Sequence, residues 1–376
     1  MHINASGTPT RDTMPHQPQR PTRLHSQVVI SGATALMFKA NPSATMLSAL
    51  LLALNAGALA QPAEIPRTPD GKPNFQGVWT NETQTPLERP EALGDKRAYT
   101  PEEAAQQVVN TAARIEREAA PIDPDRAPPE KGAPIGLEAD WKFPDTSVVT
   151  VNGEARTSLI IDPPNGRLPP PPEGGPRDWR SQMLARPGVA EFDGPELRTV
   201  GERCLLSVLS PAGPPMVPMS YNSNYRIVQT PDYLMIMTEM VNDARIIRID
   251  DEPLLQGMFR WMGDSVGHWE GDTLVVTTDK IHPQQSFRGS TGALTTTEWF
   301  SLESPQQINY RVTVNDPEGF SQPWTAEVPL RALPAGTQLY EYACHEGNYS
   351  IIGALAGARR QEQDAREAPQ PVGAYP

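Results

Sequence analysis

Residues 225–249 decide the fold, and they read YRIVQTPDYLMIMTEMVNDARIIRI. Apolar and polar residues alternate there in three short runs, which are separated by Pro231-Asp232 and Asn242-Asp243. Alternation with a period of two is typical of β-strands, and Pro, Asn and Asp are typical of turns. The stretch therefore predicts three consecutive strands joined by tight turns, at Tyr225–Gln229, Tyr233–Met240 and Ala244–Ile249.

The same pattern continues downstream to residue 344. No stretch between the expected strands is long and helical enough for the crossover that parallel strands need. Short strands joined by tight turns indicate an antiparallel meander, which closes as a barrel or packs as a sandwich. We predict a mainly β protein with a lipocalin-like barrel, and a β-sandwich is the alternative. The further expected strands are Ser265–Trp269, Thr273–Thr278, Leu294–Leu302, Gln307–Val314, Trp324–Val328 and Gln338–Cys344.

The residues before this region carry one strand signal and one helix signal. Gly77-Val78-Trp79 predicts the first strand, and a Gly-x-Trp at that place is found in lipocalin-like barrels. Thr100 has the features of a helix N-cap, since Pro101 and two glutamates follow it. We expect this helix to reach about Ala119 and, because its apolar stripe is narrow, to lie on the surface.

Proline is dense from residue 121 to residue 187, which predicts an irregular wrap over the surface. Asn152-Gly153 is a strong hairpin signal inside the wrap. It separates two expected strands, Ser147–Val151 and Thr157–Ile161. A last surface helix is expected at Ile351–Glu367.

The first sixty residues have the features of an export signal. Lys39 precedes a short apolar run, Met46–Leu54, and Ala58-Leu59-Ala60 has the small-x-small pattern that a signal peptidase cuts, which makes Gln61 the expected mature start. The run is too short for a stable membrane anchor. Met37 is an alternative start of translation. We predict a periplasmic or secreted protein.

The expected organisation has four parts. Residues 1–60 form the leader and signal peptide. Residues 61–200 hold the Gly-x-Trp strand, the first helix and the Pro-rich wrap. Residues 201–350 form the antiparallel β core, and residues 351–376 form the C-terminal helix and tail.

The charge of the chain excludes one class of partner. The 376 residues include 32 Lys and Arg against 45 Asp and Glu. Without the leader, which holds four basic residues and one acidic residue, the protein has 28 basic and 44 acidic residues and a net charge of −16. Such a surface repels phosphate backbones, so nucleic acid is not an expected partner. A small organic molecule is the partner that we expect.

The two cysteines, Cys204 and Cys344, are both in the expected mature part. An even pair in an oxidising compartment most often forms a disulfide. The competing interpretation is a free nucleophile, which Cys344-His345 invites. Adjacent residues on a strand point to opposite faces, however, so this thiol and this imidazole would not meet. We favour the disulfide.

Several long motifs stand in fixed order between about residues 200 and 360. They are YNSNYRIVQTP at 221–231, WMGDS at 261–265, WEGDTLVV at 269–276, FRGS at 287–290 and YEYACHEGNY at 340–349. On these motifs the chain resembles a large family of secreted, largely uncharacterised bacterial β-rich proteins. The resemblance implies a secreted β-rich protein and no particular activity. His268 stands where the resemblance leads us to expect Arg in many relatives.

Glu239, Glu298 and Glu341 are the carboxylates to consider as acid–base groups, because each shares an expected strand face with apolar neighbours. An ionisable group is costly to bury there without a partner or a ligand. The structural alternative is an ion pair with Arg245, Arg260 or Arg311, and it is the commoner use of such residues.

The main candidate site is the end of the last expected strand. His345 and Glu346 are the candidate catalytic pair there, with Glu298 or Glu239 orienting the imidazole. The candidate ligand-binding residues are Tyr221, Asn222, Asn224, Asn348 and Tyr349, together with Asp264 and His268, which share one face of another strand. The alternative is that His345 and Asn348 only satisfy backbone groups where the strand ends.

Motifs for other chemistry are missing. There is no helix-borne metal-ligand spacing, no Gly-x-Ser-x-Gly nucleophile elbow and no glycine-rich phosphate loop, so we predict neither a metal nor a cofactor. Two functions remain: an exported small-molecule-binding barrel, or a periplasmic hydrolase or lyase that uses carboxylate and histidine acid–base catalysis. The sequence predicts no oligomeric state.

Overall fold

The computed structural model describes residues 64–119, 121, 125, 127, 147–175, 178–207, 213–219, 221–285 and 287–367. The expected signal peptide, its cleavage after Ala60, the tail after residue 367 and most of residues 121–146 lie outside the described residues. Among the residues described, no helix is long and apolar enough to cross a bilayer.

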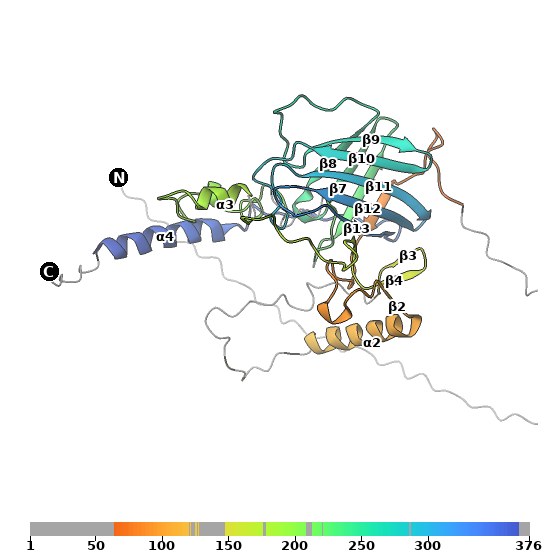
Figure 1. Ribbon diagram of the computed structural model, residues 1–376, viewed down its shortest axis with the longest axis horizontal. Helices are drawn as coiled ribbons and strands as arrows, with labels where there is room; N and C mark the ends of the chain where they lie inside the picture. The colour runs from red at the N-terminus through yellow and green to blue at the C-terminus, as the bar shows by residue number, and fades with distance from the viewer. Residues whose placement is uncertain are drawn as a thin grey trace, which may run out of the picture. The chain divides into compact units, whose positions relative to one another are not determined.

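Nine strands form a closed barrel (Figure 1). The ring closes because β12 pairs with β11 along one edge and, through Gln307 and Ile308, with β14 along the other. This confirms the prediction of a mainly β barrel. In order round the barrel the strands are β11 (Thr295–Ser304), β10 (Thr273–Asp279), β9 (Asp264–Glu270), β8 (Ala244–Ile249), β7 (Tyr233–Thr238), β6 (Asn224–Gln229), β1 (Gly77–Thr80), β14 (Leu330–Ala332) and β12 (Gln307–Asn315).

One neighbouring pair differs from the expected antiparallel meander. Strands β8 and β9 run parallel, with Ile247 opposite Ser265. The connection, residues 250–263, is irregular rather than helical, but it is long enough to return the chain to the end of the barrel where β8 begins. Gly263 ends it at a φ of 74°, where an added Cβ would come within 2.7 Å of the carbonyl oxygen of Asp279. A glycine is therefore required at this close approach.

The two ends of the barrel differ. The closed end carries the β6–β7 and β9–β10 turns and is covered by the segment before β1. There Phe75 stacks on Trp269 at 5.7 Å, and the indole of Trp79 donates to the Phe75 carbonyl oxygen at 2.8 Å. The other end, which we call the rim, carries Asn224, Thr238 and other strand ends.

The side chains that face the barrel interior also differ between the ends. Those toward the closed end are mostly apolar, and those toward the rim are mostly polar. The buried apolar residues include Ile227, Leu234, Ile247, Leu274 and Phe300, and the buried polar ones include Tyr225, Thr238, Arg245, Thr278, Thr296 and Glu298.

The first helix, α2 (Pro101–Glu118), confirms the prediction in detail. Thr100 accepts from the backbone N–H of Glu103, whose carboxylate accepts from the Thr100 N–H. No residue of α2 is buried, as the narrow apolar stripe predicted.

The other elements outside the barrel are short, except for the last helix. Asn152 and Gly153 both have positive φ and form the turn of the predicted hairpin. The predicted second strand of this hairpin, Thr157–Ile161, is wrong, because Val151 pairs with Glu154 directly after the turn and Ile160 pairs with Ala326 of another sheet. The elements are β2 (Ala98–Tyr99), β3 (Thr150–Val151) and β4 (Glu154–Arg156) in a small sheet, β5 (Ile160–Asp162) and β13 (Trp324–Glu327) beyond β12, η1 (Glu91–Leu93), α3 (Trp179–Leu184), η3 (Pro195–Leu197), η4 (Met240–Asn242) and α4 (Tyr349–Glu367).

The expected last strand, Gln338–Cys344, is not a strand. Its backbone is held by side chains instead of by a neighbouring strand. The N–H of Tyr340 donates to Glu239 at 3.1 Å, and the N–H of Tyr342 donates to the Asn242 side chain at 2.8 Å. Because polar side chains satisfy these groups, the segment crosses the rim without joining the sheet.

Candidate functional site

The motif at residues 340–349, which we call the rim segment, lies against the rim of the barrel. Besides its backbone contacts, it places the hydroxyl of Tyr342 3.4 Å from that of Tyr221. Glu239 links the segment to β6, because its carboxylate also accepts from the Asn224 amide at 2.7 Å. The structure thus brings Tyr221, Asn224 and Glu239 together with the rim segment.

A disulfide fixes the rim segment to the chain before the barrel. Cys204 and Cys344 are bonded, with their Cα atoms 5.7 Å apart. This confirms the predicted pairing. Asn348 adds to the link, since its amide donates to the carbonyl oxygen of Glu202 at 2.7 Å. Asn348 thus satisfies a backbone group, as the structural alternative expected of it.

A pocket of about 330 Å³ opens beside this disulfide. It is large enough for a small organic molecule. We call it the rim pocket, and its polar lining comes from Asp243, Glu341, Tyr342, His345 and Glu346. Both predicted catalytic residues of the last motif, His345 and Glu346, are exposed there.

Burial changes the acidity of two groups in the rim pocket. It raises the pKa of the Asp243 carboxyl, although the Ser207 backbone N–H, which donates to it at 2.8 Å, lowers the pKa in part. Burial and the hydrogen bond with Tyr221 raise the pKa of Tyr342 to about 12. The pocket therefore offers a protonated phenol, a carboxyl that holds its proton more tightly than usual, and the exposed imidazole of His345.

The two carboxylates expected to orient His345 have other partners. Glu239 is 4% exposed and holds Asn224 and the Tyr340 backbone. Glu298 is fully buried inside the barrel, where the guanidinium of Arg245 donates to both of its oxygens at 3.0 Å. This pairing with Arg245 is the structural alternative that the sequence offered.

A buried polar cluster surrounds Glu298. Tyr310 donates to Glu298 at 2.8 Å, and its hydroxyl accepts from the backbone N–H of Met216 at 3.1 Å. Burial and the neighbouring carboxylate raise the pKa of Tyr310, so the phenol stays protonated. Within the part of the chain described, Arg245 Nε and the hydroxyls of Thr238 and Thr296 are buried without a hydrogen-bond partner.

The remaining predicted residues lie elsewhere or serve the backbone. Asp264 is buried against Arg248, whose guanidinium donates to it at 2.9 Å, and it also accepts from the Leu254 N–H. It therefore anchors the connection between β8 and β9. His268 is exposed, lies in the half of β9 next to the closed end, and contacts Glu270 at 3.1 Å. Asn222 has a φ of 52°, a conformation that Asn tolerates well. Tyr349 is exposed at the start of α4.

Asp243 and Tyr342, which line the rim pocket, were not among the predicted site residues. Asp243 was interpreted only as part of a turn, and Tyr342 only as part of a strand. In the sequence, Asp243 directly follows the residues that form η4, and Tyr342 stands inside a motif of polar residues. Their raised pKa values depend on burial by segments far apart in the chain, which no local pattern reveals.

Comparisons with known proteins identify no family for this chain. No protein-family description and no curated protein matches the chain. Among solved structures, the chain is similar to a mutant of the fluorescent protein UnaG, with 14% identity over 30% of this chain and 71% of that chain. The TM-score is 0.19, so the likeness carries no argument about fold or ligand.

Proposed function

We propose that this protein is an exported β-barrel protein that binds a small polar organic molecule in the rim pocket. The observation that carries the proposal is the lining of that pocket, where Asp243, Tyr342 and His345 converge beside the disulfide. A concave site with a few convergent polar groups, some with shifted pKa, is typical of ligand sites. The motif YEYACHEGNY supplies most of this lining. Membership of the secreted bacterial family that these motifs resemble is part of the proposal.

Ligand binding should depend on His345 and not on His268. Both imidazoles are exposed, but only His345 lines the rim pocket. We expect His345→Ala to weaken ligand binding about tenfold or more, because the variant loses one good hydrogen bond to the ligand. Its melting temperature should not change. His268→Ala should bind as the wild type does. Calorimetric titration with a ligand retained by the purified protein measures both, and equal affinities for the two variants would count against the site.

Export is the second part of the proposal. The predicted signal peptide ends at Ala60, and the paired cysteines fit an oxidising compartment. The mature protein should therefore begin at Gln61. Intact-mass measurement of protein recovered from the cell envelope checks this, and a chain that keeps residues 37–60 would contradict it.

Acid–base catalysis is a second candidate function, and one observation favours it. His345 shares the rim pocket with Asp243, a carboxyl whose pKa is raised. Such a pair could donate and accept a proton in hydrolysis or elimination of a small substrate. Asp243→Asn should then abolish turnover while ligand affinity stays within a few-fold of the wild type. Loss of affinity without any measurable turnover would leave only the binding function.

Asp243 should also affect how stability depends on pH. Because its pKa is higher in the folded than in the unfolded state, it stabilises the fold below the unfolded value of about 4, and this contribution is lost as the pH rises through the folded pKa. Asp243→Asn keeps an oxygen acceptor for the Ser207 N–H but does not titrate. We expect the variant to gain stability relative to the wild type as the pH rises above about 4. Urea unfolding at several pH values tests this, and a parallel pH dependence of the two proteins would contradict it.

A further inference from the structure

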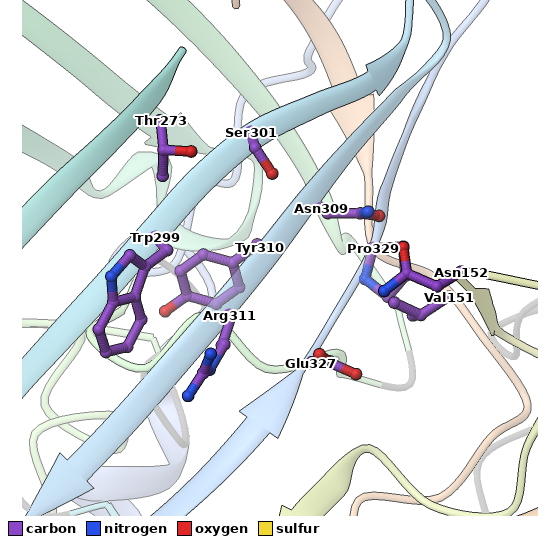
Figure 2. A pocket seen from close by; sticks show the side chains of 10 residues that line it. All are labelled: Val151, Asn152, Thr273, Trp299, Ser301, Asn309, Tyr310, Arg311, Glu327 and Pro329. Carbon is purple, nitrogen blue, oxygen red and sulfur yellow. The ribbon is translucent and has the colours of Figure 1, made fainter. Parts of the chain in front are cut away.

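A second pocket, of about 280 Å³, lies on the outer wall of the barrel (Figure 2), and Tyr310 of the cluster around Glu298 is among the residues that line it. Its floor is a row of register partners across three strands: Trp299 on β11, Arg311 on β12 and Glu327 on β13. Ser301 and Asn309, a second cross-strand pair, lie one step toward the closed end. We call this the wall pocket.

Arg311 supplies the positive charge of the wall pocket. Its guanidinium lies over the Trp299 ring at 4.8 Å, and Figure 2 shows the two side chains next to each other. Among the described residues, no carboxylate lies within ion-pair distance of Arg311. Stacking fixes the plane of a guanidinium but leaves its N–H groups at the edge available to donate.

The neighbouring carboxylate forms no ion pair with Arg311. Glu327 stands directly opposite Arg311 on β13, yet it accepts from Arg156 at 2.7 Å. Arg156 is 2% exposed and also pairs with Glu154, so it fastens β4 to the barrel wall. The buried Arg156 thus holds the carboxylate of Glu327 and fixes one side of the pocket.

The rest of the lining is rich in neutral hydrogen-bonding groups. The β3–β4 turn brings the amide of Asn152 to the pocket from the side opposite Trp299, as Figure 2 shows. Asn309 adds a second amide, and Thr273 and Ser301 add hydroxyls. Amides and hydroxyls both donate and accept, which suits a ligand that carries several hydroxyl groups.

We propose that the wall pocket binds a sugar acid, a single sugar ring that carries a carboxylate. The carboxylate would accept two hydrogen bonds from Arg311, the geometry in which guanidinium binds carboxylate best. The C–H face of the ring would lie beside Trp299, and its hydroxyls would bond with Asn152 and Asn309. The pocket volume is close to the lower limit for ligand sites, which suits one ring.

Calorimetric titration with D-galacturonate, D-galactose and acetate tests this proposal on the full chain. The affinity for galacturonate should be at least about tenfold higher than that for galactose or acetate, because only galacturonate has both the charge and the hydroxyls. Arg311→Gln should weaken galacturonate binding by a similar factor. Arg226→Gln, on the outer face of β6 and outside the pocket, is the matched control and should bind as the wild type does.

Three results would overturn the proposal. They are no binding of galacturonate to the wild type, equal affinity in Arg311→Gln, and binding of galactose or acetate as tight as that of galacturonate. His345→Ala should leave galacturonate binding unchanged, which separates this site from the rim pocket. Both variants should melt at the wild-type temperature, because Arg311 and His345 are exposed.

Discussion

Replacing both Cys204 and Cys344 by Ala is expected to lower the free energy of unfolding by about 2–5 kcal/mol. The disulfide joins residues 140 positions apart, and closing so long a loop removes much conformational entropy from the unfolded chain. It also fixes the rim segment, which otherwise depends on side-chain contacts such as those from Asn242. Urea unfolding of oxidised wild type and of the double variant measures the difference.

The control for this experiment is the reduced wild-type protein. Reduction should lower the stability of the wild type to that of the double variant, and it should leave the variant itself unchanged. If the oxidised wild type and the variant unfold at the same urea concentration, the disulfide adds nothing to stability. In that case its role would be limited to shaping the rim pocket.

Breaking the buried pair of Arg245 and Glu298 should cost about 3–5 kcal/mol. In Glu298→Leu the guanidinium of Arg245 stays inside the barrel without its carboxylate, and Tyr310 loses the acceptor for its hydroxyl. An uncompensated buried charge is much more costly than the pair itself. We therefore expect the double variant Arg245→Met with Glu298→Leu to recover most of the lost stability.

An exposed ion pair provides the matched control. Arg67 and Asp272 join at 2.7 Å, but both side chains are about half exposed. Asp272→Asn should leave the stability close to that of the wild type, because water screens such pairs. A double variant no more stable than Glu298→Leu would contradict this account of the interior. So would a Glu298→Leu protein as stable as the wild type.

Local patterns were enough to predict most of the barrel. The alternation in residues 225–249 gave three strands close to β6, β7 and β8, and the Thr100 cap gave α2. The pattern could not show that Gln338–Cys344 stays out of the sheet. That outcome depends on Glu239 and Asn242, about a hundred positions away, which bond to its backbone. The parallel pairing of β8 with β9 likewise depends on an irregular connection that has no sequence signature.

The candidate site was predicted in part. Residues within one motif, such as His345 and Glu346, stay together in any fold, and the disulfide brings Cys204 to them. Alternation showed that Asp264 and His268 share a strand face. It could not show that this face is the outer wall, because both faces of that strand carry polar and apolar residues. Glu298 was identified as a buried carboxylate, but its partner among several arginines was set by the closure of the barrel.

The most direct test of the central proposal is native mass spectrometry of the protein after incubation with the small-molecule fraction of the cells that export it. The wild type and the His268→Ala control should both retain a component of fixed added mass. A variant with both His345→Ala and Asp243→Asn should lose that component while its melting temperature shows that it remains folded. If no component distinguishes the wild type from the folded double variant, the rim pocket is not the ligand site.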